Sequence, residues 1–315
     1  MNKVIGLIFV VFVAVAASYA FSARHGPSMP ATSLHIEKLL VLDAERVGQR
    51  IVAVGEAGRV FVSDNEGQSW SEGKSPAQSL LSNVYFLDGK LGWAVGHDSV
   101  ILKSEDGGAN WSEVYKAPDE QKPLLDVWFA DANQGFAIGA YGTFLQTADG
   151  GKSWQGRKIF EEDRHFNAIT RLTDGTLMIV GELGTLLRSQ DGGLTWNAAE
   201  SPYKGSYFGV LPLEEGVVLA FGMRGKLVRS VDHGVSWTLV ETGTLSSLFG
   251  GRVLEDGRVL LVGQDGAALE SRDRGVSFKS LKNPDSRASS AVIATSGDWL
   301  LFGEGGMKRF TPSKP

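Results

Sequence analysis

The sequence contains no cysteine among its 315 residues. A disulfide framework, a thiolate zinc site and a cysteine nucleophile are therefore excluded. Proline is also scarce, with ten residues against forty glycines, and the glycines follow no collagen-like period. Glycine used in this way indicates many turns. The composition is not basic either, because the formal net charge is −5, which argues against a general nucleic-acid-binding protein.

Recognisable catalytic motifs are missing as well. The sequence has no Gly-x-Ser-x-Gly elbow, no phosphate-binding loop and no dinucleotide fingerprint before a helix. Its five histidines are scattered, and no pair has metal-ligand spacing. They are His25, His35, His97, His165 and His233. We therefore expect no catalytic residue, no metal ion and no cofactor.

A long hydrophobic run occurs only near the N-terminus. Lys3 precedes 14 apolar residues from Val4 to Ala17, and Ser18 and Ala20 supply small side chains at a cleavage site. This pattern is typical of a signal peptide over residues 1–20. An uncleaved membrane anchor is the alternative, although a span needs roughly 20 residues. We expect export to the periplasm, with residues 21–35 as a lead-in to the folded domain.

The rest of the chain is a repeat. The string Ser-x-Asp-x-Gly-x-(Ser/Thr)-Trp, called an Asp box, occurs in strict or looser form six times, and its closing aromatics are 41 to 43 residues apart. The acidic or amide residue and the closing aromatic of each box are Asn65 and Trp70, Asp106 and Trp111, Asp149 and Trp154, Asp191 and Trp196, Asp232 and Trp237, and Asp273 and Phe278.

A second marker counts seven units instead of six. An apolar run ending in glycine precedes each box and occurs once more after the last one. These glycines are Gly55, Gly96, Gly139, Gly181, Gly222, Gly263 and Gly303. Each unit has the composition of four short strands, which in the second unit are expected at 83–87, 92–96, 100–104 and 111–115. The period predicts an all-β, seven-bladed propeller over residues 36–315.

The seventh unit has no sequence for a fourth strand, since the chain ends soon after Phe310. We expect the segment near residues 31–36 to supply that strand and so to close the ring.

The box residues are predicted to be structural. The aspartate can accept hydrogen bonds from main-chain N–H groups of its own turn, and the glycine two positions later suits a positive φ. The closing aromatic can pack between neighbouring sheets. A calcium loop would need several oxygen ligands at alternate positions, and the box offers one.

The fuller units GAYGTFLQTADGGKSW (139–154) and GELGTLLRSQDGGLTW (181–196) resemble the bacterial neuraminidase repeat. With seven units and an export signal, residues 36–315 resemble the photosystem II stability and assembly factor family, which has relatives in non-photosynthetic bacteria. The resemblance implies a monomeric, non-catalytic propeller that binds a membrane-protein partner. In heterotrophic relatives it implies an association with envelope transporters of the resistance-nodulation-division type. Photosynthetic members carry an arginine-rich face, whereas this chain is acidic overall.

Sialidases share the Asp box, so a glycan-binding or glycoside-hydrolysing propeller is the alternative. Sialidase chemistry needs three arginines, a tyrosine nucleophile paired with a glutamate, and an acidic proton donor. No arginine here lies in a recognisable sialidase context, and the Arg-Ile-Pro-like motif of that class is missing.

A partner surface is expected where the second strand of each blade turns into the third, at the end that also carries the links between blades. The residues of these turns vary between units, whereas the repeat residues that flank them are constant. The turns should surround the mouth of the central channel. The candidate turn residues are Glu56, His97, Asp98, Tyr141, Glu182, Arg224, Asp265 and Glu304. The links and the strand starts that follow them add Phe160, His165, Tyr203, Tyr207 and Phe208. Aromatics among charges favour interfaces, so Tyr141, Phe160, Tyr203 and Tyr207 are predicted to form the apolar centre.

Overall fold

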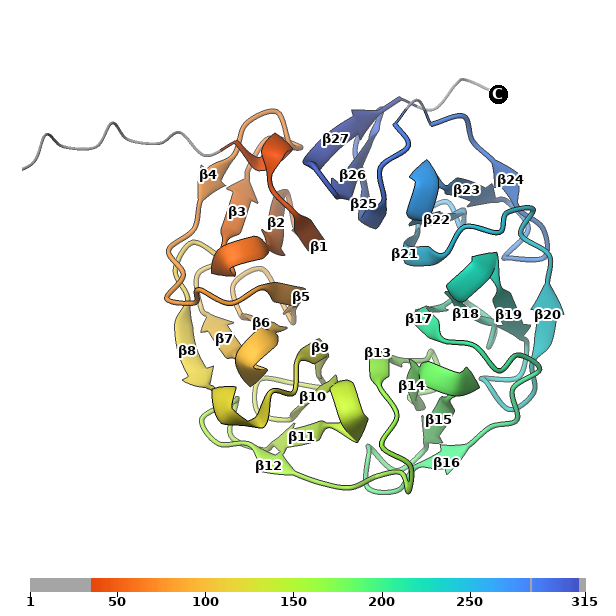
Figure 1. The fold of residues 1–315 in the computed structure, drawn as a ribbon, viewed down its shortest axis with the longest axis horizontal. Helices are drawn as coiled ribbons and strands as arrows, with labels where there is room; N and C mark the ends of the chain where they lie inside the picture. Colours follow the sequence, from red (N-terminus) through yellow and green to blue (C-terminus); the bar gives the residue numbers. More distant parts are fainter. Residues whose placement is uncertain (1–34, 284, 312–315) are drawn as a thin grey trace, which may run out of the picture. The chain divides into compact units, whose positions relative to one another are not determined.

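The computed structural model describes residues 35–283 and 285–311. Its compact unit is Ile36–Pro315, in which seven antiparallel sheets surround a central axis (Figure 1). The strands of each sheet follow chain order from the axis outward. The predicted seven-bladed, all-β propeller is therefore confirmed. Among the described residues, six blades have four strands and the seventh has three.

The strands are short and match the repeat. Blades 1 and 2 contain β1 (Val41–Val47), β2 (Arg50–Gly55), β3 (Val60–Ser63), β4 (Ser71–Glu72), β5 (Leu81–Phe86), β6 (Gly92–Gly96), β7 (Ile101–Ser104) and β8 (Ser112–Tyr115). Blades 3 and 4 contain β9 (Leu124–Phe129), β10 (Gly135–Gly139), β11 (Phe144–Thr147), β12 (Gln155–Gly156), β13 (Phe166–Arg171), β14 (Leu177–Gly181), β15 (Leu186–Ser189) and β16 (Asn197–Ala198). Blades 5 to 7 contain β17 (Tyr207–Pro212), β18 (Val218–Gly222), β19 (Leu227–Ser230), β20 (Thr238–Val240), β21 (Leu248–Val253), β22 (Val259–Gly263), β23 (Ala268–Ser271), β24 (Lys279–Ser280), β25 (Ser289–Ala294), β26 (Trp299–Gly303) and β27 (Gly306–Phe310).

The second strand of each blade is apolar because both of its faces are covered by neighbouring blades. In β2, Val52 and Val54 belong to the core shared with blade 2, whereas Ile51 and Ala53 belong to the core shared with blade 7. A strand buried on both faces reads as a continuous apolar run instead of an alternation. This explains the apolar residues that precede each marker glycine.

The marker glycines are required by a close approach of two backbone segments. A Cβ atom at Gly139 would lie 2.2 Å from the carbonyl oxygen of Pro123, just before β9. The next residue, Ala140, donates its N–H to the same oxygen at 2.9 Å. The six equivalent glycines meet an equivalent carbonyl oxygen at 2.0 to 2.2 Å. Only glycine therefore fits at this position of each blade.

The Asp boxes form closed turns between the third and fourth strands. In blade 3, Asp149 Oδ1 accepts the N–H of Ser153 at 2.9 Å and the Thr147 hydroxyl at 2.9 Å. Hydrogen bonds from Ser153 lower the pKa of Asp149 to about 2. The Trp154 indole donates to the Gly151 carbonyl at 3.1 Å and packs on the core between blades 2 and 3. In blade 1, the amide of Asn65 replaces the carboxylate and accepts the N–H of Ser69 at 2.9 Å.

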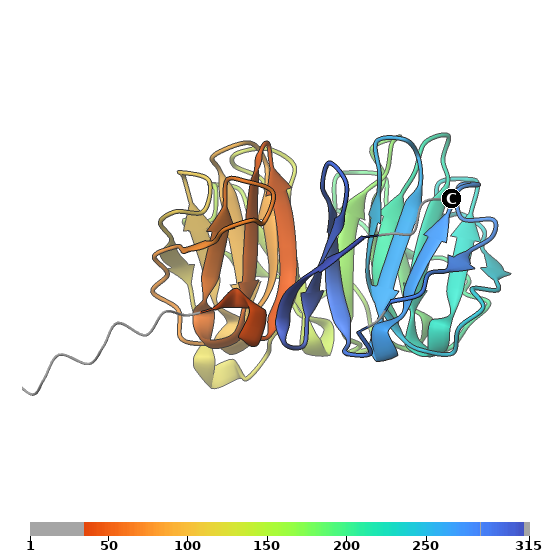
Figure 2. The ribbon, with the colours of Figure 1, turned by 90° about the horizontal axis from the view of Figure 1, so that it is seen from above.

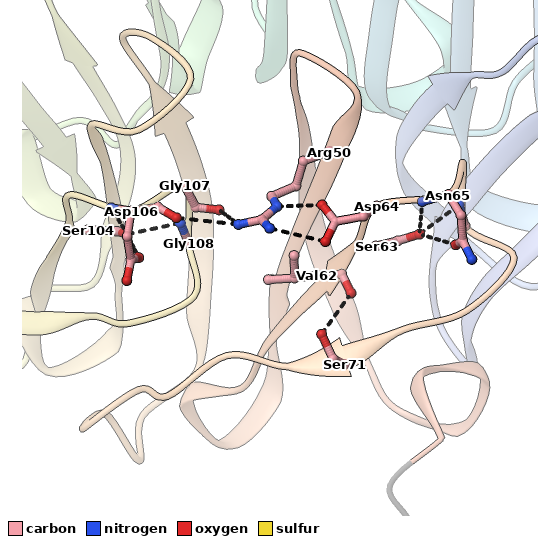
Figure 3. A network of polar contacts seen from close by, with 11 residues as sticks. Arg50, Val62, Ser63, Asp64, Asn65, Ser71, Ser104, Asp106, Gly107 and Gly108 are labelled. Carbon is pink, nitrogen blue, oxygen red and sulfur yellow. Dashed lines mark hydrogen bonds and ion pairs between the residues drawn. The ribbon is translucent and has the colours of Figure 1, made fainter.

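Arginines connect several blades to the next at the Asp-box end. Figure 3 shows Arg50 of blade 1, whose guanidinium pairs with Asp64 at 2.7 and 3.0 Å. Its Nη1 also donates to the carbonyls of Asp106 and Gly107 in the box of blade 2, at 3.3 and 3.2 Å. Equivalent donations from later blades run from Arg157 to Gly193 and Leu194, from Arg188 to His233, and from Arg229 to Arg274. Side chains thus link neighbouring sheets that share no strand.

The ring closes through packing between blades 7 and 1. The 3-10 turn η1 (Ile36–Lys38) places Ile36, which is 2 % exposed, in one core with Val41, Phe302 and Met307. The closing strand expected at 31–36 is therefore wrong for Ile36, because its main chain follows a 3-10 turn instead of pairing with β27. Residues 31–34 lie outside the described residues. No helix within 35–283 or 285–311 is long and apolar enough to cross a membrane.

Candidate functional site

The second-to-third turns lie together at one end of the propeller, here called the turn face. In blades 1 to 6 they are 3-10 turns: η2 (Glu56–Gly58), η3 (His97–Ser99), η5 (Ala140–Gly142), η6 (Glu182–Gly184), η7 (Met223–Gly225) and η8 (Gln264–Gly266). Blade 7 has a tight turn at Glu304 and Gly305. The link between blades 2 and 3 lies on η3, where Ala117 donates to the Asp98 carbonyl at 3.1 Å. Figure 2 shows these turns along one end.

The Asp-box turns lie at the opposite end, beside the turns between first and second strands. The N–H of Gly107 in the second box donates to the carbonyl of Lys90 at 2.9 Å, and Gly150 donates to Asn133 in the same way. The structure therefore separates the two sets of loops as the strand alternation predicted.

The middle residue of each 3-10 turn has a left-handed backbone. Tyr141 has φ of 56° and Leu183 has φ of 54°, and their side chains are 56 % and 53 % exposed. This conformation costs an L-residue about 1–2 kcal/mol. Glycine would remove that cost, as it does in blade 7 at Gly305. All six 3-10 turns share this backbone, and at two of them it presents a large apolar side chain to solvent.

Three of the four residues predicted as an apolar centre lie on the turn face of blades 3 to 5. The Tyr141 ring meets the edge of His165 at 4.9 Å between centroids. Phe160 is half-buried beneath the Arg164 guanidinium, 5.4 Å from its ring centroid. Tyr203 is half-buried and donates its hydroxyl to the Met223 carbonyl at 3.3 Å. Of the three side chains, Tyr141 is the most exposed.

The fourth, Tyr207, was predicted wrongly. It is the first residue of β17 and is fully buried, and its hydroxyl bonds to Ser201 Oγ at 2.8 Å. Burial raises its pKa to about 12. The same position is apolar in five of the other six blades, for example Leu81 and Leu124, so the repeat alignment carried the correct signal. The next residue, Phe208, points to the channel instead.

The predicted polar ring is only partly assembled. Its exposed members are His97, Asp98, Arg224, Asp265 and Glu304, while Glu56 and Glu182 are half-buried. Asp265 accepts the Ser246 hydroxyl at 3.0 Å, and Glu182 accepts the N–H of His165 at 3.3 Å. Of all these residues, His97 and Glu304 line the channel mouth. The others belong to the outer part of the turn face.

The mouth of the channel is mainly apolar, which sequence reasoning missed. A cavity of about 500 Å³ lies there, lined by the second residue of every inner strand. Those residues are Leu42, Ser82, Leu125, Asn167, Phe208, Phe249 and Ser290. The Phe208 and Phe249 rings lie 5.5 Å apart between centroids. Aligning the inner strands position by position would have revealed this ring of side chains.

Below the mouth, a chamber of about 360 Å³ carries carboxyl groups. Asp43 Oδ2 accepts the N–H of Val84 and the side-chain amide of Asn83, both at 3.0 Å. Asp126 Oδ2 accepts the N–H of Ile169 at 2.8 Å. Burial raises the pKa of Asp43 to about 7 and that of Asp126 to about 8. Each aspartate therefore links its own inner strand to that of the next blade.

An ion pair also lies in the chamber. Glu45 pairs with Arg252 at 3.4 Å within the chamber. Burial raises the pKa of Glu45, and the guanidinium opposes that shift. Within the described part of the chain, no group of three or more His, Cys, Asp or Glu residues could hold a metal ion.

Comparisons with known proteins give matches in both fold and sequence family. A search of curated proteins gives no significant match. A solved structure of YCF48 bound to a D1 peptide is 20 % identical, with a TM-score of 0.69 over 87 % of this chain and 92 % of that one. YCF48 from Cyanidioschyzon merolae is 16 % identical, with a TM-score of 0.67 over 87 % and 96 %. A streptogramin B lyase is 11 % identical, with a TM-score of 0.75 over 89 % and 96 %.

At these identities the structural matches show the fold alone, and propellers of different activity share it. The sequence match is more informative. A family profile described as photosynthesis system II assembly factor YCF48 matches residues 116–297, which is more than half of the chain. The chain therefore belongs to the YCF48 assembly factor family.

Proposed function

We propose that this protein is an exported, non-catalytic propeller that binds a membrane protein through its turn face, as an assembly factor or accessory subunit. The observation that carries the proposal is the exposure of Tyr141 and Leu183 on left-handed turn positions. Folding alone gives no reason to keep large apolar side chains there, whereas an interface would bury them.

Two further observations support a protein partner. The half-buried Phe160 and Tyr203 lie on the same face as Tyr141, and the exposed Met223, in the η7 turn of blade 5, accepts the Tyr203 hydroxyl at its carbonyl. Aromatic residues and methionine are enriched at interfaces. A family relative has been solved bound to a D1 peptide, so peptide binding occurs in this family.

The finer proposal is that the partner is an envelope transporter of the resistance-nodulation-division type. The turn face carries five acidic turn residues, of which Asp98, Asp265 and Glu304 are exposed, against one basic turn residue, Arg224. The turns themselves are therefore acidic on balance, in contrast to the arginine-rich face that the family resemblance implies for photosynthetic members. The hydrophobic segment 4–17 supports export to the periplasm, where such a partner would be reached.

The chamber carboxyls support a non-catalytic role. Asp43 and Asp126 already accept main-chain N–H groups of the neighbouring blades, so they act as links within the fold. A fluorogenic sialoside assay tests the enzymatic alternative directly. We expect no turnover above buffer, and turnover lost in an Asp126→Asn variant would contradict the proposal.

The partner surface is tested by capture from detergent-solubilised membranes of the source cells. The tagged propeller is compared with Leu183→Asp and with Leu194→Asp, which changes an exposed leucine on the Asp-box turn of the same blade. We expect a specific membrane protein to be lost with Leu183→Asp and retained with Leu194→Asp. Equal capture by all three proteins would contradict the use of the turn face.

A further inference from the structure

The inner strands build the channel in levels. The first and fourth residues of most inner strands are buried between blades, while the second and third residues face the axis. All seven second residues line the mouth cavity, and all seven third residues line the chamber. Consecutive residues of a strand are about 3.3 Å apart along the strand. The apolar mouth therefore lies directly above the level of the third residues.

The third residues of the inner strands are polar on one side of the channel and have small side chains on the other. Blades 1 to 3 contribute Asp43, Asn83 and Asp126. Blades 4 to 7 contribute Ala168, Gly209, Gly250 and Ala291, which have short side chains or none. This asymmetry leaves space beside the two carboxyls. Phe249 and Ser290 line both cavities, so the mouth and the chamber adjoin.

An unsatisfied acceptor lies at the same level. The side-chain oxygen Oδ1 of Asn83 is fully buried and accepts no hydrogen bond, while its amide donates to Asp43 at 3.0 Å. A buried oxygen without a donor is costly, because its lost hydration is not replaced by a hydrogen bond. An N–H donor entering the chamber would remove that cost. The orphaned oxygen thus points to a ligand that donates hydrogen bonds.

The charges around the chamber favour a cationic donor. The charged and titratable groups lining it are Asp43, Glu45, Tyr85, Asp126, Arg171 and Arg252. Arg252 is paired with Glu45. Asp43 and Asp126 are held by main-chain N–H groups and form no ion pair within 4 Å among the described residues. A cation here would find two carboxyls and the Asn83 oxygen, with Trp128 as an aromatic neighbour.

We propose that the channel binds an aliphatic chain ending in an ammonium group. The chain contacts Leu42, Leu125, Phe208 and Phe249 in the mouth, and the ammonium lies at Asp43, Asn83 and Asp126. A free alkyl amine and a lysine side chain of a partner protein share this chemistry. The site stands on its own geometry, so it does not depend on the membrane-protein partner proposed above.

The test is isothermal titration of the full chain with n-pentylammonium, n-pentanol and n-pentanoate. We expect saturable binding of pentylammonium, with no comparable binding of the alcohol or the anion. Because burial favours the protonated carboxyls, the cation must displace their protons. Affinity should therefore rise about tenfold or more from pH 6 to pH 8.5. At pH 7, titrations in two buffers of different ionisation enthalpy should show proton release.

The variants separate the site from general electrostatic attraction. Asp43→Asn with Asp126→Asn should abolish the preference for the cation. The control, Asp119→Asn with Asp265→Asn, removes two exposed carboxyls of the turn face and should leave binding unchanged. Binding that is equal for cation and alcohol, that releases no protons, or that survives in the channel variant would overturn the proposal. The proton-release measurement needs only the wild-type chain, so it decides the matter even if the channel variant misfolds.

A second arm identifies the source of the ammonium group. A blocked peptide with one lysine among glycines is titrated under the same conditions. Binding as tight as that of pentylammonium would assign the site to a lysine of a protein, and binding of pentylammonium alone would assign it to a free amine.

Discussion

The guanidinium of Arg309 donates to the main-chain carbonyl of Glu66 at 2.9 Å, across 243 residues of sequence. Arg309 lies in β27, the third strand of blade 7, and Glu66 lies in the Asp box of blade 1. Arg188 and Arg229 occupy the same strand position in blades 4 and 5 and donate to the box of the next blade. Ring closure therefore repeats a contact that is used between neighbouring blades elsewhere in the ring.

Removing that contact should weaken the seam. We expect Arg309→Met to lower the free energy of unfolding by about 1 kcal/mol, because the side chain is exposed and its carbonyl partner can be solvated by water. Chemical denaturation measures this loss. Arg274→Met is the control, since its exposed ion pair with Glu215 joins the Asp box of blade 6 to the β17–β18 turn of blade 5, away from the seam, and should contribute less. A larger loss for Arg274→Met would contradict the account.

The buried start of the folded unit should matter more than the arginine. Ile36 is nearly inaccessible in the core between blades 7 and 1, so Ile36→Ala should cost about 2–4 kcal/mol. Thermal unfolding followed by circular dichroism measures the change. Leu245→Ala provides the comparison, because that leucine is 84 % exposed and should be neutral. A neutral Ile36→Ala would show that η1 is not part of the seam.

The channel carboxyls should make stability depend on pH. Burial raises the folded-state pKa of Asp43 to about 7 and of Asp126 to about 8, above the value of 3.8 for the free side chain. Their contribution is full below about pH 4 and is lost as the pH rises through 7 and 8. We expect unfolding free energy to fall by a few kcal/mol between pH 4 and pH 9.

Asp126→Asn should flatten that profile, since the amide oxygen can still accept the Ile169 N–H but does not titrate. The Asp-box carboxyls do not interfere, because hydrogen bonds lower the pKa of Asp191 and Asp232 to about 2 and their contribution is lost only in stronger acid. An unchanged profile in Asp126→Asn would rule out the burial effect.

The marker glycines should be intolerant of a methyl group. Gly139→Ala would place Cβ on the Pro123 carbonyl oxygen, so we expect a loss of several kcal/mol or failure to fold. Gly192→Ala tests a different effect, because Gly192 has φ of 72° and open space around it. It should cost about 1 kcal/mol from the left-handed backbone alone. Expression and melting temperature of the two variants separate steric conflict from backbone strain, and equal losses would contradict the distinction.

Much of this architecture could be predicted from the repeat. The seven marker glycines correctly predicted seven blades. The strands expected at 83–87 and 92–96 match β5 and β6 closely. The predictions worked because one local rule, a close backbone approach that excludes Cβ, recurs in each blade. The repeat also separated the turn face from the Asp-box end.

The ring closure and the channel were harder to predict. Among the described residues, the closing seam includes side chains far apart in sequence, such as Ile36 and Phe302, and no local pattern records that contact. Tyr207 was assigned to the surface because polar residues surround it in sequence, although its strand position is buried. In the sequence, Asp43 and Asp126 resemble ordinary polar residues of a strand. Only an alignment of the inner strands, position by position, shows that both are third residues and line the chamber.

Site-specific photocrosslinking tests the use of the turn face most directly. Benzoylphenylalanine is placed at Leu183 or at Leu194, which are exposed leucines at opposite ends of blade 4, and membranes are irradiated with the protein bound. We expect a crosslink to a membrane protein from position 183 and none from position 194. A crosslink from position 194 with none from position 183 would contradict it.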